Sequence, residues 1–255
     1  MARRHITGGN WKMHTTLPEA LALAQEVRHR LGAQAVGEVV LFPPFPFLAA
    51  VAEKVAGSRV AVGAQDLHFE AKGAFTGAVS ATMIASTGCT HVLVGHSERR
   101  TVFGDSDAVV ARKLRAALAA GLRPVLCVGE QLAERQGGTT FAVVDQQLAA
   151  ALDGLERAAL GHLVIAYEPV WAIGTGLVAS PEQAQEVHAH IRAWLATRLG
   201  AAFAAACRIQ YGGSVKGSNA AGLFAKDDID GMLVGGASLT ADEFAAIVRA
   251  GRAHP

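Results

Sequence analysis

LVIAYEPVWAIGTGLVASPEQAQEVHAHIRAWLATRL, residues 163–199, decides the fold of this 255-residue chain. Its first five residues form an apolar run of the kind that makes a buried strand. A loop with two glycines follows. Ser180, Pro181 and Gln183 then supply a capping box with proline at the first helical position. The stretch therefore predicts one strand, one long loop and one helix over residues 181–199.

The same unit recurs along the chain. Short apolar runs predict strands over residues 5–8, 38–42, 60–64, 91–95, 123–128, 163–167, 207–211 and 231–234. Ala- and Leu-rich stretches predict helices over residues 17–31, 46–55, 80–87, 108–120, 140–152, 181–199, 218–224 and 241–250. Strand–helix alternation implies parallel strands joined by crossover helices.

Eight such units favour an α/β protein built as a closed (β/α)8 barrel, with eight parallel strands ringed by helices. An open, doubly wound sheet is the main alternative. No residues are left over for a second domain, and no Pro/Gly/Ser linker divides the chain. We therefore expect residues 1–255 to form a single barrel domain.

The composition narrows the class of protein. The chain is 51% hydrophobic and 18% charged, with a net charge of +1, so it lacks the basic footprint of a nucleic-acid binder. No segment approaches the roughly 20 apolar residues of a membrane span, and the first residues show no secretory signal. Three widely spaced cysteines, Cys89, Cys127 and Cys207, argue against a disulfide framework. We expect a cytoplasmic protein that binds neither nucleic acid nor membrane.

Reactive residues follow four of the predicted strands. In a barrel of this kind the active site lies where the strands run into the following loops. The residues concerned are Asn10 and Lys12 after strand one, His96, Ser97 and Glu98 after strand four, Glu168 after strand six, and glycine pairs after strands seven and eight. Four distant parts of the chain are thus expected to meet at one rim.

The glycine pairs are typical of a phosphate cradle. Gly212 and Gly213 precede Ser214, and Gly235 and Gly236 follow the last strand. Backbone N–H groups approach an anion closely only where no Cβ blocks them. One such pair is usually a simple turn, but two in these loops match the phosphate site that recurs in such barrels.

Glu168 stands between Tyr167 and Trp171 in an apolar setting. A carboxylate there is poorly solvated, which suits a general base near neutral pH. Lys12 suits a phosphate or a developing oxyanion. A lone lysine is nevertheless more often solvated, and His96 is as readily a packed histidine as a functional one.

The loop over residues 169–179 contains Gly174-Thr175-Gly176 and ends at a helix start. It is either an ordinary surface loop or a lid whose closure expels water from a bound anion. Its glycines also match a dinucleotide-binding fingerprint. That interpretation is discounted because the glycines do not directly follow the strand.

Five motifs together resemble the triosephosphate isomerase family. They are GNWKM (9–13), GHSERR (95–100), AYEPVWAIGTG (166–176), YGGSV (211–215) and LVGGASL (233–239). The resemblance covers essentially the whole chain, in order. It implies a TIM barrel that interconverts dihydroxyacetone phosphate and D-glyceraldehyde 3-phosphate through an enediolate, without a metal or other cofactor.

The resemblance also implies a role for each site residue. Glu168 is similar to the proton-shuttling base, His96 to the neutral electrophile, and Lys12 and Asn10 to residues that line the same site. The implied phosphate contacts are the backbones of Gly174, Ser214, Gly235 and Gly236. The implied supporting and lid residues are Ser97, Glu98 beside Lys12, Ile173 and Leu233 over the base, Tyr211, and Trp171 with Glu130 and Tyr167 as alternate partners.

The chain departs from the family at three positions. Ala78 stands where the family usually has glutamate, His14 where it often has asparagine, and Gly217 where proline is common. Ala78 and His14 belong to regions that face a second subunit in this family, which puts its usual inter-subunit ion pair in question. By resemblance, Thr76 reaches into the neighbouring subunit's site. The best expectation is a homodimer, with a higher assembly as the alternative.

Two rival functions are compatible with such a barrel. A Schiff-base aldolase would need a lysine projecting inward from a late strand, but strand six ends in Glu168. A non-catalytic sugar-phosphate sensor would have no need to keep a base, an electrophile and a lid together. Both rivals predict no isomerase activity.

Overall fold

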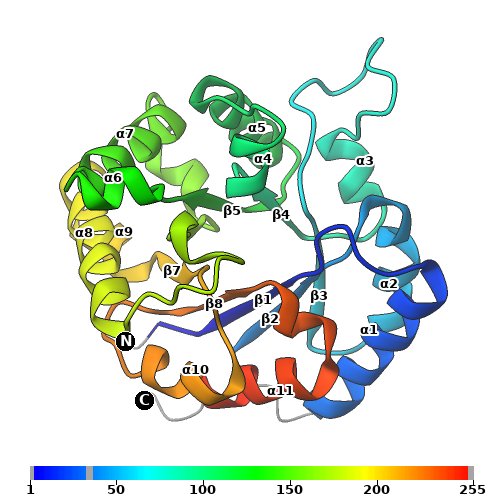
Figure 1. Cartoon of the computed structure of the whole chain (residues 1–255). Helices are drawn as coiled ribbons and strands as arrows, with labels where there is room; N and C mark the ends of the chain where they lie inside the picture. The colour runs from blue at the N-terminus through cyan, green and yellow to red at the C-terminus, as the bar shows by residue number, and fades with distance from the viewer. Residues whose placement is uncertain (1–2, 33–36, 252–255) are drawn as a thin grey trace.

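The computed structural model describes residues 3–32 and 37–251. Eight parallel strands follow one another around a closed barrel in chain order, and β1 pairs with both β2 and β8. The barrel class predicted from the sequence is confirmed (Figure 1). The strands are β1 (Ile6–Asn10), β2 (Glu38–Phe42), β3 (Val60–Ala64), β4 (His91–Val94), β5 (Arg123–Val128), β6 (Val164–Tyr167), β7 (Arg208–Tyr211) and β8 (Gly231–Val234).

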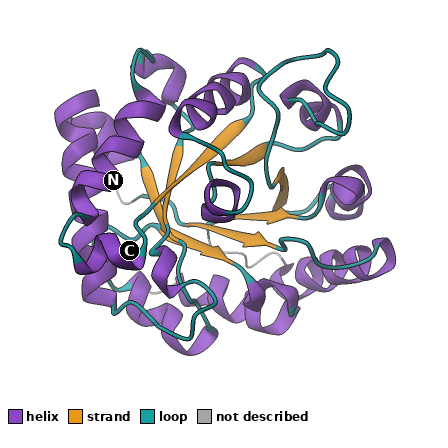
Figure 2. Cartoon of the chain, turned by 45° about the horizontal axis from the view of Figure 1, so that its top comes forward, coloured by secondary structure: helices purple, strands orange, loops and turns teal. Residues whose placement is uncertain are grey.

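Helices ring the barrel and cover its outer face, as Figure 2 shows. They are α1 (Leu17–Leu31), α2 (Leu48–Val55), α3 (Ala81–Ser86), α4 (Ser97–Thr101), α5 (Asp107–Ala119), α6 (Leu132–Gln136), α7 (Thr140–Leu152), α8 (Pro181–Leu199), α9 (Ala201–Ala206), α10 (Gly217–Phe224) and α11 (Ala241–Ala250). The 3-10 turns that lie wholly within the described residues are η2 (Phe45–Phe47), η3 (Arg157–Leu160), η4 (Val170–Ala172) and η5 (Gly236–Leu239). The helices predicted over residues 17–31, 140–152, 181–199 and 241–250 have the expected bounds.

Local cap chemistry explains two of these helices. At the start of α8, the Ser180 hydroxyl accepts from the Gln183 N–H at 3.1 Å, and the Gln183 carbonyl oxygen accepts from the Ser180 N–H at 2.9 Å. At the start of α1, the Glu19 carboxylate accepts from the Thr16 N–H at 2.7 Å. Such caps satisfy N–H groups that have no partner inside the helix.

The first strand differs from its prediction, because it spans residues 6–10 rather than 5–8. Asn10 therefore ends the strand instead of following it. Gly8 and Gly9 suggested a strand end, but they serve close packing. A Cβ at Gly8 would lie 2.9 Å from the Phe42 ring, and one at Gly9 would lie 3.0 Å from the Ser238 Cβ.

Several short elements were not predicted. The helix predicted over residues 46–55 begins as the 3-10 turn η2 and becomes α-helical only at Leu48. The helices α4, α6 and α9 have five or six residues each, too few to show a helical period. Gly200, with φ of 92°, ends α8 as a stop signal would, but α9 starts directly after it.

Two apolar layers fill the structure. The barrel interior is packed by Ile6, Val40, Phe42, Leu93, Val125, Cys127, Val164, Ala166 and Leu233. A larger cluster fills the space between the strands and the helices. Gln210 is buried in the interior and donates to the Ile6 and Met232 carbonyls at 3.1 and 3.0 Å. A packed interior leaves the rims as the places for a site.

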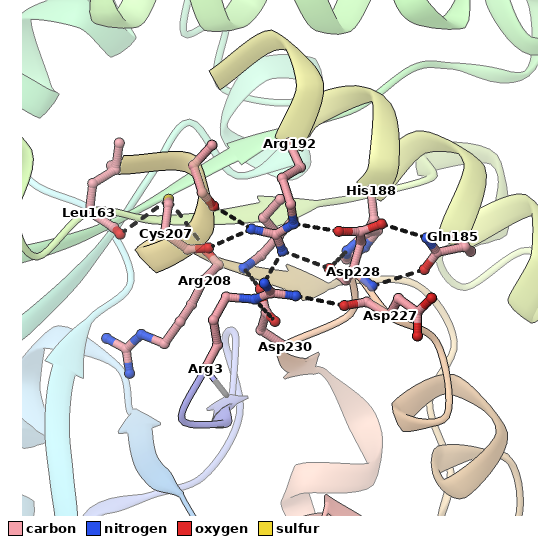
Figure 3. A network of polar contacts seen from close by, with 12 residues as sticks. Arg3, Leu163, Gln185, His188, Arg192, Cys207, Arg208, Asp227, Asp228 and Asp230 are labelled. Atoms are coloured by element: carbon pink, nitrogen blue, oxygen red, sulfur yellow. Dashed lines mark hydrogen bonds and ion pairs between the residues drawn. The ribbon is translucent and has the colours of Figure 1, made fainter. Parts of the chain in front are cut away.

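At the rim where the strands begin, a network of charged side chains joins α8 to the residues around the starts of β7 and β8 (Figure 3). Arg192 of α8 binds the carboxylates of Asp228 and Asp230, the latter at 2.7 Å. The Asp230 carboxylate also accepts from the Ile209 N–H at 2.8 Å and from Arg3 at 2.5 Å. These contacts tie the N-terminal segment, α8, β7 and the segment before β8 together.

Candidate active site

A cavity of about 510 Å³ opens at the rim where the strands end. It is lined by residues from the loops after β1, β4, β6, β7 and β8, as the rule for such barrels predicts. The expected site residues among its lining are Asn10, Lys12, His96, Glu98, Glu168, Ile173, Gly174, Ser214, Leu233, Gly235 and Gly236. Of the expected set, Ser97, Trp171 and Tyr211 do not line the cavity.

Glu168 lies directly after β6 and is 2% exposed. One carboxylate oxygen, Oε2, accepts from the Ser97 N–H at 2.8 Å, and the other, Oε1, lies 3.0 Å from the His96 Nε2. A Cβ at Gly212 would lie 2.9 Å from the Glu168 Cγ, so that glycine leaves room for the carboxylate. The carboxylate is thus held by hydrogen bonds and is adjacent to an open cavity.

His96 is buried and caps the short helix α4. Its Nδ1 accepts from the Glu98 N–H at 3.2 Å, so in this tautomer the proton lies on Nε2 and points to Glu168. Burial lowers the pKa of His96, but the charge and hydrogen bond of Glu168 raise it, and the pKa lies above its ordinary value. Protonation of the ring would cost the Glu98 hydrogen bond, because an imidazolium Nδ1 can only donate.

Lys12 has a left-handed backbone, with φ of 52°, which is uncommon for a residue other than glycine. Two side chains hold it. Asn10 Oδ1 accepts from the Lys12 N–H at 3.0 Å, and Gln65 donates to the Lys12 carbonyl at 2.8 Å. The Lys12 ammonium forms an ion pair with Glu98. Local strain is thus kept where a charge must be aimed.

The phosphate cradle expected from the glycine pairs lies on the same cavity. Gly235 and Gly236 line it, and η5 starts at Gly236. A Cβ at Gly236 would have no neighbour within 4 Å, so the backbone there faces open space. A Cβ at Gly235 would lie 3.9 Å from the Lys12 Nζ. A cation therefore stands beside exposed backbone, the arrangement that an anion requires.

The loop after η4 projects from the rim and is exposed over residues 174–178. Gly174 and Gly176 have φ of 70° and 84°. Leu177 and Val178 are 50% and 56% exposed, although both are apolar. Ile173 and Gly174 at its near end line the cavity.

Glu130 anchors the base of this loop. Its Oε1 accepts from the Trp171 Nε1–H at 2.8 Å and from the Tyr167 hydroxyl at 3.0 Å. Burial raises the pKa of Glu130, against the hydrogen bond from Trp171 that lowers it. The Tyr211 hydroxyl is buried below Gly213 and has no hydrogen-bond partner among the described residues. Glu130, Tyr167 and Tyr211 thus lie beneath the loop after η4 and the glycine pair that follows β7.

Two charged residues that line the cavity were not predicted, Lys216 and Glu243. Lys216 directly follows the YGGSV stretch, and its place two residues after Ser214 is the signal that could have identified it. Glu243 comes from α11 and reaches the cavity beside α10, where it accepts from the Gly217 N–H at 2.7 Å. No local pattern marks that contact, because the two residues are 26 positions apart.

Two further searches of the described residues concern metal sites and membrane-spanning helices. Within residues 3–32 and 37–251, no group of three His, Cys, Asp or Glu side chains is placed to hold a metal ion. Over the same part of the chain, no helix combines the length and the apolar character needed to cross a membrane.

Comparison with known proteins agrees with the geometry. The family model described as triosephosphate isomerase matches residues 5–251. The triosephosphate isomerase of Thiobacillus denitrificans is 57% identical over 248 residues, covering 97% of this chain and 98% of that protein. That of Bordetella pertussis is 56% identical over 248 residues, covering 97% and 98%, and that of Moorella thermoacetica is 54% identical over 246 residues, covering 96% and 98%.

Proposed function

We propose that Glu168, His96 and Lys12 carry out the reaction of the triosephosphate isomerase family, to which this chain belongs. The protein is an isomerase that interconverts dihydroxyacetone phosphate and D-glyceraldehyde 3-phosphate, a step of glycolysis. The resemblance of the five motifs to the family is confirmed by the match over residues 5–251. What is proposed is which residues do the chemistry and how.

The reaction moves one proton between two adjacent carbons. Glu168 removes a proton from the carbon next to the carbonyl, and the C–H electron pair forms the carbon–carbon double bond of an enediolate. The hydroxyl proton on the first carbon's oxygen moves to the oxyanion on the second carbon. The same carboxyl group then returns a proton to the second carbon, where the electron pair of the carbon–carbon double bond takes it, while the oxygen on the first carbon re-forms a carbonyl. One buried carboxylate next to the cavity suffices for both transfers.

His96 stabilises the oxygen on which negative charge develops. Its Nε2–H points into the region of Glu168, and the Glu98 N–H on Nδ1 keeps the ring in that tautomer. When Glu168 turns toward substrate carbon, the largest influence that raises the His96 pKa is removed and burial is left to lower it. The neutral ring is then the donor, supported by the Lys12 charge.

The phosphate is held by the backbones of Gly174, Ser214, Gly235 and Gly236. These residues line one side of the cavity, with the Lys12 amine next to Gly235. Closure of the lid brings Ile173 over the base, opposite Leu233. Exclusion of water at that stage strengthens every charge interaction in the site and protects the enediolate from loss of phosphate. No cofactor is required by these steps.

The observation that carries the proposal is the Glu168 carboxylate, buried yet adjacent to the cavity and to His96. Glu168→Asp should lower kcat on the order of 10²-fold, because retracting the carboxylate by one methylene misplaces it. The affinity for a phosphate-bearing inhibitor should stay near the wild-type value. A coupled assay on glyceraldehyde 3-phosphate measures the first quantity, and near-wild-type turnover would reject Glu168 as the base.

The coupled assay, inhibitor binding and borohydride trapping on the wild type give different results for the two rival functions. A Schiff-base aldolase would form a substrate adduct that borohydride traps, and a sugar-phosphate sensor would bind the inhibitor without any turnover. The isomerase assignment predicts turnover and no trapped adduct.

We also propose that the protein works as a homodimer. The loop between β3 and α3 extends away from the barrel (Figure 1), and Thr76 and Ala78 on it are exposed. Large exposed apolar side chains lie in this loop, in α3 and in the loops after β1 and β4: Met13, Phe75, Met83, Val102 and Phe103. Their exposure supports an interface on this side of the barrel, where a second copy would cover them.

Arg99 lines the same surface cavity as Ala78, so it would lie near a glutamate at position 78. Its guanidinium lies 3.1 Å from Asp66 and 3.4 Å from Asp105 of the same chain, so it is paired without a partner subunit. Apolar contact is then the main support of the dimer, with Thr76 reaching the neighbouring site. Sedimentation over a range of protein concentrations tests this, and a stable, active monomer would contradict it.

The working compartment and the domain organisation are proposed in the same way. All three cysteines, Cys89, Cys127 and Cys207, are free and buried. That supports a reducing compartment, and hence the cytoplasm. The closed barrel supports one domain over residues 1–255.

A further inference from the structure

We infer that Lys216 is a second phosphate-attracting cation of this site, acting beside Lys12 on the approach and binding of the triose phosphate. The inference rests on the phosphate cradle proposed above and adds a residue that the family motifs do not mark. Three observations carry it: the place of Lys216 on the cavity wall, the rigid tie of its backbone to the cradle, and the lack of a counter-charge.

Lys216 lines the cavity next to the cradle. Its backbone is fixed by Asn219, whose Oδ1 accepts from the Lys216 N–H at 2.8 Å and whose Nδ2 donates to the Ser214 carbonyl at 3.1 Å. One side chain thus ties the Lys216 backbone to the loop whose backbone is proposed to hold the phosphate. The flexible lysine side chain starts from a fixed point beside the anion site.

The balance of charges on the cavity wall gives the Lys216 ammonium a role in attracting an anion. The wall carries three carboxylates, Glu98, Glu168 and Glu243, and two ammonium groups, Lys12 and Lys216. The Lys12 charge is already paired with Glu98. A substrate with a doubly charged phosphate approaches a cavity whose lysines are outnumbered by carboxylates, so each unpaired positive charge counts.

Lys216 is the lysine of this cavity that remains available. It is exposed, and within the described parts of the chain it forms no ion pair. Glu243 lines the same cavity, but its Oε1 is engaged by the N–H of Gly217, the residue that follows Lys216, at 2.7 Å. Proline at position 217 would remove that N–H. Glycine at this position therefore keeps Glu243 at the start of α10 and leaves the Lys216 charge unpaired.

The test uses the full-length enzyme and the variants Lys216→Met and Lys216→Arg. For Lys216→Met we expect KM for glyceraldehyde 3-phosphate to rise about three- to tenfold at low ionic strength, as loss of one partly screened charge near a dianion predicts. The change should appear in KM rather than in kcat. Raising the ionic strength should shrink the difference from wild type, and Lys216→Arg should restore most of the affinity.

Two controls isolate the phosphate. Lys226→Met removes a lysine that pairs with Glu182 outside the cavity, and its KM should match wild type. With unphosphorylated glyceraldehyde, Lys216→Met should show no loss of kcat/KM relative to wild type. Competitive inhibition by inorganic phosphate should weaken by the same factor as the KM for the phosphorylated substrate rises.

The outcomes separate this inference from the cradle on which it rests. If inorganic phosphate inhibits the wild type and Lys216→Met equally, with equal KM and equal salt dependence, Lys216 plays no part and the inference is overturned. If inorganic phosphate does not inhibit the wild type at all, the cradle itself is rejected together with the inference. Equal losses for Lys216→Met on both substrates would reveal a structural effect and also overturn it.

Discussion

The two rims of the barrel use charge in opposite ways. At the rim where the strands begin, Glu38 of β2 binds Arg208 of β7 at 2.5 Å and Arg123 of β5 at 3.0 Å, and His91 of β4 lies 3.3 Å away. At the rim where the strands end, Glu168 has a backbone N–H and His96 for partners and lies next to a cavity. Both carboxylates are largely buried, but only Glu38 is surrounded by cations. The rim where the strands begin, which holds Glu38, is called the lower rim below, and the rim where they end, which holds Glu168, the upper rim.

The two carboxylates also differ in how their surroundings act on their protonation. The hydrogen bond to His91 and the hydrogen bond and charge of Arg208 hold the pKa of Glu38 well below its usual range, against burial, which raises it. Such a group is fixed in one charge state and serves stability. As the proposed base, Glu168 would gain and lose a proton in each turnover, and a guanidinium pair would oppose that. The proposed site thus depends on a buried carboxylate that has no cationic partner. The rest of the fold must be stable enough to offset the cost of burying it.

The largest expected effect is a loss of the free energy of unfolding when the lower rim is mutated. Arg192→Met leaves Asp228 and Asp230 without their shared cation and frees the Ala204 and Cys207 carbonyls (Figure 3). Removing one partner of a buried pair costs about 3–5 kcal/mol of the free energy of unfolding. Urea denaturation measures this loss, while kcat of the folded fraction should stay unchanged.

Lys226→Met is the matched control for that experiment. Its pair with Glu182 is exposed, so the expected loss is below about 1 kcal/mol. A loss for Arg192→Met as small as that of Lys226→Met, or a selective loss of kcat, would break the assignment of the lower rim to stability.

The second prediction concerns pH. His188 is fully buried beside the lower network, and burial lowers its pKa to about 4, although the Asp228 carbonyl and the Asp230 and Asp228 charges oppose this. The folded protein then binds fewer protons than the unfolded chain between pH 6.5 and 4. Stability from this group is therefore present at neutral pH and falls by about 1.5 kcal/mol from pH 6.5 to pH 5.

The variant His188→Gln removes that titration and keeps a donor for the Asp228 carbonyl. The free energies of unfolding of wild type and variant should converge as the pH falls from 6.5 to 5. Parallel pH profiles for the two proteins would show that His188 is not held neutral by burial.

The smallest effect belongs to the lid. Trp171→Phe removes the hydrogen bond to Glu130 at the base of the loop. One hydrogen bond to a charged group contributes about 1.5–3 kcal/mol, and only the part that differs between open and closed lids reaches the rate. We expect kcat to fall severalfold with little change in the free energy of unfolding, measured by steady-state kinetics and urea titration. An unchanged kcat would remove Trp171 from the lid mechanism.

Much of the upper rim could be predicted from the sequence. Glu168 follows an apolar strand and precedes a loop with glycines, and the glycine pairs stand after two later strands. These are local patterns. Because the strands of a barrel end at one rim, the residues after them can be placed together without knowing any side-chain contact. The direct contact between His96 and Glu168 was not predictable, because rotamers set it.

The contacts of the lower rim could not be predicted, because no local sequence pattern marks them. Glu38 and Arg208 are 170 positions apart, and each looks like an ordinary charged residue at a strand start. Glu243 was missed for the same reason, since only the fold reveals that this residue of α11 lines the cavity. Short helices such as α4 escaped because a single turn has no periodicity.

Hydrogen exchange at C1 of dihydroxyacetone phosphate in deuterium oxide tests the central claim most directly. The step reports proton removal by the base alone, without the return to the second carbon. If Glu168 is that base, Glu168→Gln should slow the exchange about 10²–10⁴-fold, while inorganic phosphate binds as in the wild type. Exchange at the wild-type rate in Glu168→Gln would contradict the account.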